Sequence, residues 1–264
     1  MRLNTVTHGA PHDGGAATGR PALLIAHGLF GSARNWGVIA KRLSDDRQVL
    51  AVDMRNHGDS PWADMHDYAG MADDLAGVIE AQGAPVDLLG HSMGGKAAMV
   101  LALTRPDLLR RLVVADIAPV AYGHSQNHLI AAMQSLPLAD LNTRADADAR
   151  LAAQVDDPGV RAFLLQSLDL RSQPPRWRLN LSVLADQMPG IIGWPDMGAA
   201  PPFDGATLFL TGARSDYVRA EHRAAIRAHF PRARFASLPN AGHWLHAESP
   251  RAFEQTVRVF LDHA

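Results

Sequence analysis

Short apolar runs alternate with amphipathic stretches along most of this chain. Six runs rich in Val, Leu, Ile and Ala have the length of β-strands, and they span residues 22–26, 49–52, 86–89, 112–115, 207–210 and 234–238. Stretches with helical periodicity lie at residues 36–43, 68–82, 96–103, 220–229 and 250–262. Nearly continuous apolar strands that alternate with helices predict an α/β fold, in which helices cover both faces of a mostly parallel sheet.

The alternation stops between residues 120 and 200. This stretch predicts several helices, one of which begins at Asp157-Pro158, where Asp suits the N-cap and Pro the first helical position. A helical insertion between two strands of an open α/β sheet is most simply a cap over the carboxyl ends of the strands, where such sheets bind ligands. We therefore expect a core made of residues 1–119 and 201–264, with residues 120–200 as a helical cap, or lid.

Composition narrows the possible partners of the chain. A formal net charge of −2 and a pI near 6.7 give no basic surface for nucleic acid or for an anionic membrane. No apolar run approaches the roughly 20 residues of a membrane span, and residues 1–19 lack the apolar segment of a signal peptide. We expect a cytoplasmic protein that binds neither nucleic acid nor membrane. The sequence leaves its oligomeric state open.

A serine lies in a tight turn between a predicted strand and a predicted helix. Residues 90–94 read Gly-His-Ser-Met-Gly, directly after the apolar run 86–89 and before the helical stretch 96–103. Strand, sharp turn and helix form the context of a nucleophile elbow, whose flanking glycines avoid backbone collisions. The sequence predicts that Ser92 is a nucleophile and that the backbone N–H of Met93 is free beside it.

A serine nucleophile needs a base, and a loop near the carboxyl end of the chain supplies the best candidate. His243 lies in the sequence Asn-Ala-Gly-His-Trp, residues 240–244, between the last strand and the last helix. His246 is its nearest rival, but it lies three residues on, toward the helix. His124 and His128 are spaced like two ligands on one helix face, yet no third ligand accompanies them, so we predict no metal. The chain has no cysteine, which excludes thiolate sites.

The oxyanion formed during acyl transfer needs a second N–H donor, from the loop after an early strand. Residues 27–31, His-Gly-Leu-Phe-Gly, follow the run 22–26. Gly28 permits close approach of the backbone, and the Leu29 N–H is the expected donor, with Phe30 as the alternative one residue on. Together with Met93, Leu29 would form the oxyanion hole.

The residues alone leave the acid of the triad open. Asp116 directly ends the run 112–115, and Asp216 lies in the loop after the run 207–210. Both loops are expected at the carboxyl edge of the sheet, and both keep the chain order serine, acid, histidine.

With these motifs in order, the chain resembles the α/β-hydrolase superfamily, and within it the small bacterial esterases of the YbfF type. The motifs are His27-Gly28-Leu29-Phe30-Gly31-Ser32, Arg55-Asn56-His57-Gly58, Gly90-His91-Ser92-Met93-Gly94-Gly95-Lys96, Asp116-Ile117-Ala118-Pro119-Val120 and Ala241-Gly242-His243-Trp244. The resemblance implies an eight-stranded sheet, a helical cap and cofactor-free hydrolysis of acyl esters, with thioesters as an alternative.

The same resemblance bears on the acid. Most relatives read Gly-x-x-Asp after the strand at 207–210, whereas this chain has Ser215 at that position, as the YbfF-like group does. This implies that Asp116 is the acid and that Ser215 assists it, although Asp216 next door keeps the alternative open.

The leading hypothesis is therefore a serine carboxylesterase that acts on a small-molecule acyl ester or thioester. A carbon–carbon bond hydrolase or a perhydrolase would use the same triad, and a hydrolase fold kept only for ligand binding is a non-enzymatic alternative. We expect Phe30, Trp177, Met188 and Trp194 to line the substrate pocket.

Overall fold

The computed structural model describes residues 1–9 and 20–263. Its main sheet has the strand order β1-β3-β2-β4-β5-β8-β9, and β1 is its only antiparallel strand within the described residues. The strands are β1 (Thr5–His8), β2 (Leu23–Ala26), β3 (Val49–Val52), β4 (Val86–His91), β5 (Leu109–Ala115), β8 (Ala206–Gly212) and β9 (Ala233–Leu238). The predicted α/β fold with a mostly parallel sheet is confirmed.

The expectation of eight strands is corrected to seven in the described part of the chain. Only β1 pairs with the outer edge of β3, and residues 1–4 before it form no strand that could extend the sheet further. The sequence pattern also missed β1, because this four-residue edge strand is partly exposed on both faces and has no apolar run.

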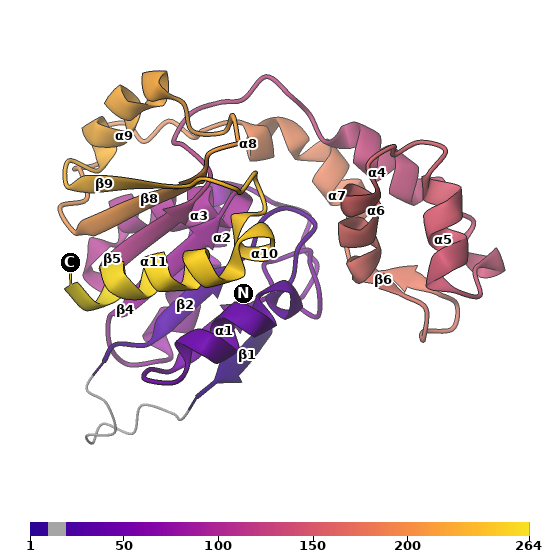
Figure 1. The fold of residues 1–264 in the computed structure, drawn as a ribbon, viewed down its shortest axis with the longest axis horizontal. Helices are drawn as coiled ribbons and strands as arrows, with labels where there is room; N and C mark the ends of the chain where they lie inside the picture. Colours follow the sequence, from indigo (N-terminus) through magenta and orange to yellow (C-terminus); the bar gives the residue numbers. More distant parts are fainter. Residues whose placement is uncertain (10–19, 264) are drawn as a thin grey trace.

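Helices cover both faces of the sheet (Figure 1). Helix α1 (Gly37–Leu43) packs with α11 (Pro250–His263) on one face, where Ile39 and Leu43 meet Phe253 and Val257. Helices α2 (Tyr68–Glu80), α3 (Met93–Thr104) and α9 (Arg223–His229) contribute to the other apolar layer. Helix α3 is buried along nearly its whole length, which explains the apolar run from Ala97 to Leu103.

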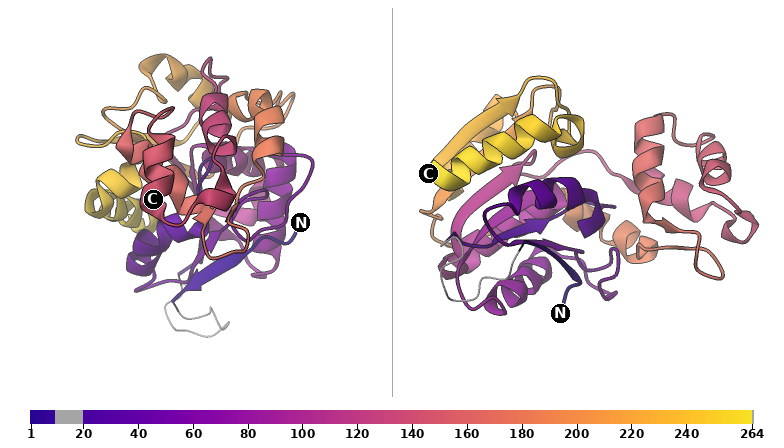
Figure 2. Two further views of the ribbon diagram at one scale, coloured as in Figure 1. Left: turned by 90° about the vertical axis from the view of Figure 1, so that its right-hand side faces the viewer. Right: turned by 60° about the horizontal axis from the view of Figure 1, so that its bottom comes forward.

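The segment between β5 and β8 lies to one side of the sheet (Figures 1 and 2). It contains helices α4 (Asn127–Gln134), α5 (Arg144–Leu151), α6 (Pro158–Leu164), α7 (Leu181–Asp186) and α8 (Met188–Ile192), with a two-stranded hairpin of β6 (Leu168–Asp169) and β7 (Arg176–Trp177). Helix α6 begins as predicted, because the Asp157 carboxylate accepts hydrogen bonds from the N–H groups of Gly159 and Val160. We call residues 120–200 the cap.

Candidate active site

Ser92 lies in a strained turn between β4 and α3. Its backbone has φ 52° and ψ −119°, a conformation that costs a non-glycine residue about 1–3 kcal/mol. The turn is possible because glycines flank it: a Cβ on Gly90 would lie 2.3 Å from the Gly94 carbonyl oxygen, and a Cβ on Gly94 would lie 2.4 Å from the His27 carbonyl oxygen. This packing holds the serine hydroxyl at the carboxyl end of the central strand.

Three side chains from distant parts of the chain form one hydrogen-bonded row. The Ser92 hydroxyl lies 3.0 Å from Nε2 of His243, and Nδ1 of His243 lies 2.8 Å from a carboxylate oxygen of Asp116. His243 belongs to the loop between β9 and α10 (Leu245–Glu248), and Asp116 directly follows β5. With the proton of neutral His243 on Nδ1, the imidazole is oriented to accept the proton of the serine.

Asp116, and not Asp216, contacts His243. Asp116 is fully buried, and its other carboxylate oxygen accepts a hydrogen bond of 3.2 Å from the Gly212 N–H. The hydroxyl of Ser215 donates to the oxygen that also faces His243. Asp216 is exposed on the neighbouring loop. The geometry thus matches the arrangement that the family resemblance implied, with Ser215 beside the carboxylate.

Two backbone N–H groups remain available near Ser92. The N–H groups of Leu29 and Met93 donate to no other described residue, and both residues line the cavity beside the serine. The Phe30 N–H, the alternative donor, is already bound to Nε2 of His57 at 3.2 Å. Leu29 and Met93 are therefore the two donors that could bind an oxyanion here.

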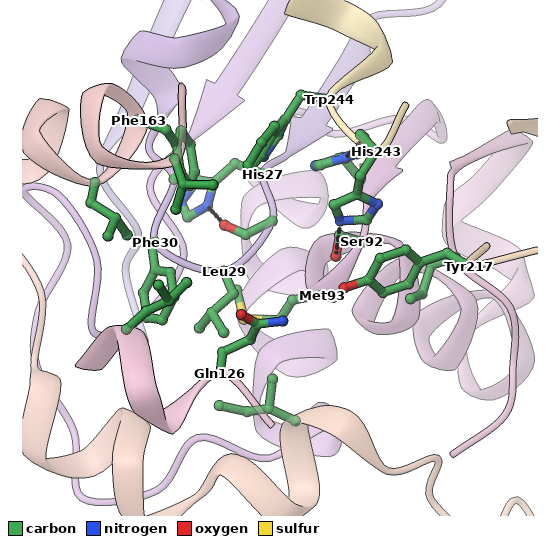
Figure 3. Close-up of a pocket in the computed structure, with 18 of the residues that line it drawn as sticks. His27, Leu29, Phe30, Ser92, Met93, Gln126, Phe163, Tyr217, His243 and Trp244 are labelled. Carbon is green, nitrogen blue, oxygen red and sulfur yellow. Dashed lines mark hydrogen bonds between the residues drawn. The ribbon is translucent and has the colours of Figure 1, made fainter. Parts of the chain in front are cut away.

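The cavity in front of Ser92 has a volume of 480 Å³ and lies between the sheet and the cap. Leu29, Phe30, Met93 and Phe163 line it, and Figure 3 shows Phe163 on the far side of the view from Tyr217. Apolar residues dominate its inner wall, and further members are Ile117, Leu129, Val160, Leu164, Ile191 and Ile192. His124, Gln126, His128, Gln154, Asp156 and Asp157 add polar groups on the cap side.

Three of the four expected pocket residues do not line this cavity. Phe30 lines it, but Trp177, Met188 and Trp194 do not. The Trp177 indole N–H donates to the Met133 carbonyl inside the cap, Met188 is buried, and the Trp194 ring packs against His229. Other residues of α4, α6 and α8, among them Leu129, Phe163 and Ile191, line the cavity instead.

Sequence reasoning also missed polar residues that reach the cavity. Lys96 is buried, and its ammonium donates to the Ile192 carbonyl at 2.9 Å and to the Gly193 carbonyl. Burial lowers the pKa of Lys96 to about 7. The Tyr217 ring stacks on His243. Lys96 lies four residues, about one helical turn, after Ser92, which is a signal that the sequence did contain.

Buried histidines surround the site without joining the row of Ser92, His243 and Asp116. His246, the rival base, stacks on Trp36 with the ring centroids 4.1 Å apart, and burial lowers its pKa to about 3. The pKa of His57 and of His91 is lowered well below the ordinary value, also mainly by burial. These imidazoles are neutral near pH 7. His57 and His91 form hydrogen bonds with backbone groups, whereas Nδ1 of His246 is buried without a hydrogen-bond partner.

Nothing in the described ranges suggests a metal centre or a membrane span. No group of three or more His, Cys, Asp or Glu side chains is placed to hold a metal ion in residues 1–9 and 20–263. In the same residues, no helix is both long enough and apolar enough to cross a membrane.

The chain is similar to proteins named as esterases and lipases. It is 43% identical to the sn-1-specific diacylglycerol lipase ABHD11 of Mus musculus, over 91% of this chain and 81% of the relative. It is 40% identical to Esterase YbfF of Escherichia coli (strain K12), over 91% and 92% of the two chains. A solved structure described as a marine microorganism esterase superposes with a TM-score of 0.91 at 36% identity, covering 98% of this chain and 99% of that one.

A family model also matches almost the whole sequence. The model described as the alpha/beta hydrolase family matches residues 23–256, which includes every strand except β1. The matched region holds Ser92, His243 and Asp116 in the order and geometry described above. The chain belongs to the alpha/beta hydrolase family.

Proposed function

We propose that this protein is a serine carboxylesterase with Ser92 as nucleophile, His243 as base and Asp116 as acid. The single observation that carries the proposal is the row of two hydrogen bonds, 3.0 Å and 2.8 Å long, that joins the three side chains. Esterases and lipases among the relatives, at 40–43% identity, support hydrolysis of a carboxylic ester rather than another reaction on the same fold.

The reaction proceeds through an acyl-enzyme. The Ser92 oxygen attacks the ester carbonyl carbon while His243 takes the hydroxyl proton, and the carbonyl oxygen becomes anionic. The N–H groups of Leu29 and Met93 stabilise that oxyanion, because each would otherwise be an unpaired donor at the cavity wall. The carbon–oxygen bond to the alcohol then breaks, and His243 returns the proton to the leaving alcohol.

Water completes the cycle. It gives a proton to His243 and attacks the acyl carbon, and collapse of the second oxyanion releases the carboxylic acid and restores the Ser92 hydroxyl. Asp116 accepts a hydrogen bond from the Nδ1–H group of His243 throughout and stabilises the imidazolium. These steps use only side chains and backbone N–H groups of the enzyme and water, so no cofactor is required.

The cap completes the substrate site in this proposal. We assign residues 120–200 to the cap, and its α4, α6 and α8 residues form the apolar wall opposite Ser92. A cavity of 480 Å³ holds a small to medium acyl ester. Thioesters are alternative substrates because the same attack applies to them. A cytoplasmic location stays a prediction.

A fluorophosphonate probe and a panel of p-nitrophenyl esters test the function. We expect the probe to label the protein at Ser92, and the Ser92→Ala variant to lose labelling and turnover while it remains folded, because the hydroxyl contributes little packing. Residual turnover within tenfold of the unmodified protein would contradict the proposal. Failure of the panel with efficient labelling would point to the carbon–carbon bond hydrolase alternative, and absence of both to a ligand-binding protein.

A further inference from the structure

Tyr217 lies on the loop after β8, beside the base but outside the row of hydrogen bonds. Its ring stacks on the His243 imidazole, with the centroids 4.0 Å apart and the planes at 19° (Figure 3). The two hydrogen bonds of His243, to Ser92 and Asp116, leave from the ring nitrogens and so lie near the plane of the imidazole. The Tyr217 ring instead covers a face of the imidazole.

The loop that carries Tyr217 also holds Asp116. The Ser215 hydroxyl donates to Asp116 and accepts from the Tyr217 N–H at 3.3 Å. The Tyr217 carbonyl accepts a hydrogen bond of 2.7 Å from the Tyr122 hydroxyl, which accepts one of 2.9 Å from the Ala118 N–H. Residues 215–217 are therefore bonded to the Asp116 carboxylate and, through the Tyr122 hydroxyl, to the backbone of Ala118, so the backbone that carries the stacked ring is held at two points.

We propose that Tyr217 is a positioning residue that holds His243 in line with Ser92 and stabilises its protonated form. The inference rests on the proposed function and adds a residue to it. A cation over an aromatic face is attracted to the negative charge of the π system. His243 becomes such a cation each time it takes the proton of Ser92, so the ring favours the transition state over the ground state.

The other groups that face His243 do not supply this effect. Asp116 binds its Nδ1 atom, and Ser92 its Nε2 atom. His91 at the end of β4 and His246 on α10 are neutral, since burial lowers the pKa of both. Glu248 on α10 pairs with Arg214 and with the Gly242 N–H instead. Tyr217 itself stays uncharged, because burial raises its pKa above the ordinary value.

Tyr217 also joins the base to the cap. Its hydroxyl lies 2.9 Å from Nε2 of His124, which belongs to the segment that leads from β5 into α4. The ring and the hydroxyl thus have separate partners. Tyr217→Phe removes the link to the cap and keeps the stacked ring, whereas Tyr217→Leu removes both.

The experiment measures kcat and KM of both variants for p-nitrophenyl butyrate as a function of pH. For Tyr217→Leu we expect kcat to fall about tenfold with KM within twofold, and the acidic limb of kcat/KM to move to lower pH by about 0.5 unit, because the imidazolium loses its aromatic partner. For Tyr217→Phe we expect kcat within threefold of the unmodified protein and an acidic limb at the same pH as in the unmodified protein. Val218→Ala, on the same loop but outside the cavity, is the matched control and should change kcat less than twofold.

A second series keeps the shape of the ring. Phe, 4-fluorophenylalanine and pentafluorophenylalanine at position 217 weaken the negative face stepwise, so we expect kcat and the acidic limb to decrease in the same order. An unchanged limb across this series, or a Tyr217→Leu variant with the pH profile of the unmodified protein, overturns the inference. The Ser92→Ala variant separates the two failures, since activity that depends on Ser92 leaves the proposed function intact even when the Tyr217 series shows no effect.

Discussion

His57 accepts a hydrogen bond of 3.2 Å from the backbone N–H of Phe30, and its own Nδ1 donates to the Arg55 carbonyl at 2.9 Å. Phe30 has a positive φ of 64°, so the loop after β2 is strained at this residue. The buried imidazole therefore binds one N–H donor of the loop, and the neighbouring Leu29 N–H is the one that we propose binds the oxyanion.

Replacing this histidine should disturb the oxyanion loop without touching the triad. We expect His57→Ala to lower kcat for p-nitrophenyl butyrate by about 10–100-fold. A misplaced Leu29 N–H would lose most of the hydrogen-bond stabilisation that one donor gives to the oxyanion. The unpaired Phe30 N–H should also lower the free energy of unfolding by about 1–3 kcal/mol in urea titration. A variant of unchanged kcat but reduced stability would show that His57 has no part in placing the donor.

The assignment of the acid predicts an ordered series of variants. Asp116→Asn should lower kcat by about 10⁴-fold, because the amide NH2 group can donate a hydrogen bond to Nδ1 and so favours the wrong tautomer of His243. Asp216→Asn is the matched control and should cost less than about tenfold, since the exposed carboxylate does not contact His243. Ser215→Ala should fall between them. If Asp216→Asn lowers kcat strongly while Asp116→Asn stays active, the acid is Asp216 and the assignment is wrong.

The buried histidines should make the protein labile to acid. The folded-state pKa of His66 and of His246 is lowered to about 3, whereas an unfolded chain binds the protons near pH 6.5. Stability is therefore complete above pH 6.5 and falls between pH 6.5 and about 3, by about 1.4 kcal/mol per pH unit for each such histidine.

The variant His246→Phe keeps an aromatic ring against Trp36 and measures how much of the acid lability comes from this one histidine. We expect the slope of unfolding free energy against pH between 6 and 4 to decrease by about 1.4 kcal/mol per unit relative to the unmodified protein. The exposed His263→Gln change serves as a control for the loss of a histidine. Equal slopes for all three proteins would exclude His246 as a source of acid lability.

Lys96 predicts a dependence of the same sign at alkaline pH. Its folded-state pKa of about 7 lies below the ordinary 10.5, so the unfolded chain holds a proton that the folded chain releases, and stability rises with pH between about 7 and 10.5. We expect the unfolding free energy of the unmodified protein, relative to that of Lys96→Met, to increase by about 1–3 kcal/mol from pH 7 to 9.5. Parallel curves for the two proteins would contradict the prediction.

The cavity wall predicts which cap residue selects the acyl chain. Phe163 on α6 lines the cavity, and its ring packs 5.4 Å from that of Trp244. Phe163→Ala should shift the preference of the enzyme toward longer p-nitrophenyl esters by about two to four carbons, because it removes a ring from the wall opposite Ser92. Trp177→Phe, inside the cap and away from the cavity, should lower stability and leave the chain-length profile unchanged; the reverse pattern would restore Trp177 to the pocket.

Local sequence patterns determined most of the fold and predicted two of the three side chains in the hydrogen-bonded row, Ser92 and His243. The apolar runs became β2, β3, β4, β5, β8 and β9 within a few residues, because buried parallel strands need continuous apolar stretches. The glycines around Ser92 and the loop of His243 could also be recognised in the sequence. The geometry they require extends over only a few neighbouring residues.

Tertiary structure decided the questions that depend on residues far apart in the chain. Asp116 and His243 are separated by 127 positions, and only the packing of β5 beside β8 shows that Asp116, rather than Asp216, meets the imidazole. The donor at Leu29 depends on His57, and the cavity wall depends on how the cap folds on itself. Apolar side chains such as Trp177 and Phe163 look alike in sequence, and only their three-dimensional neighbours separate the core of the cap from the wall of the pocket.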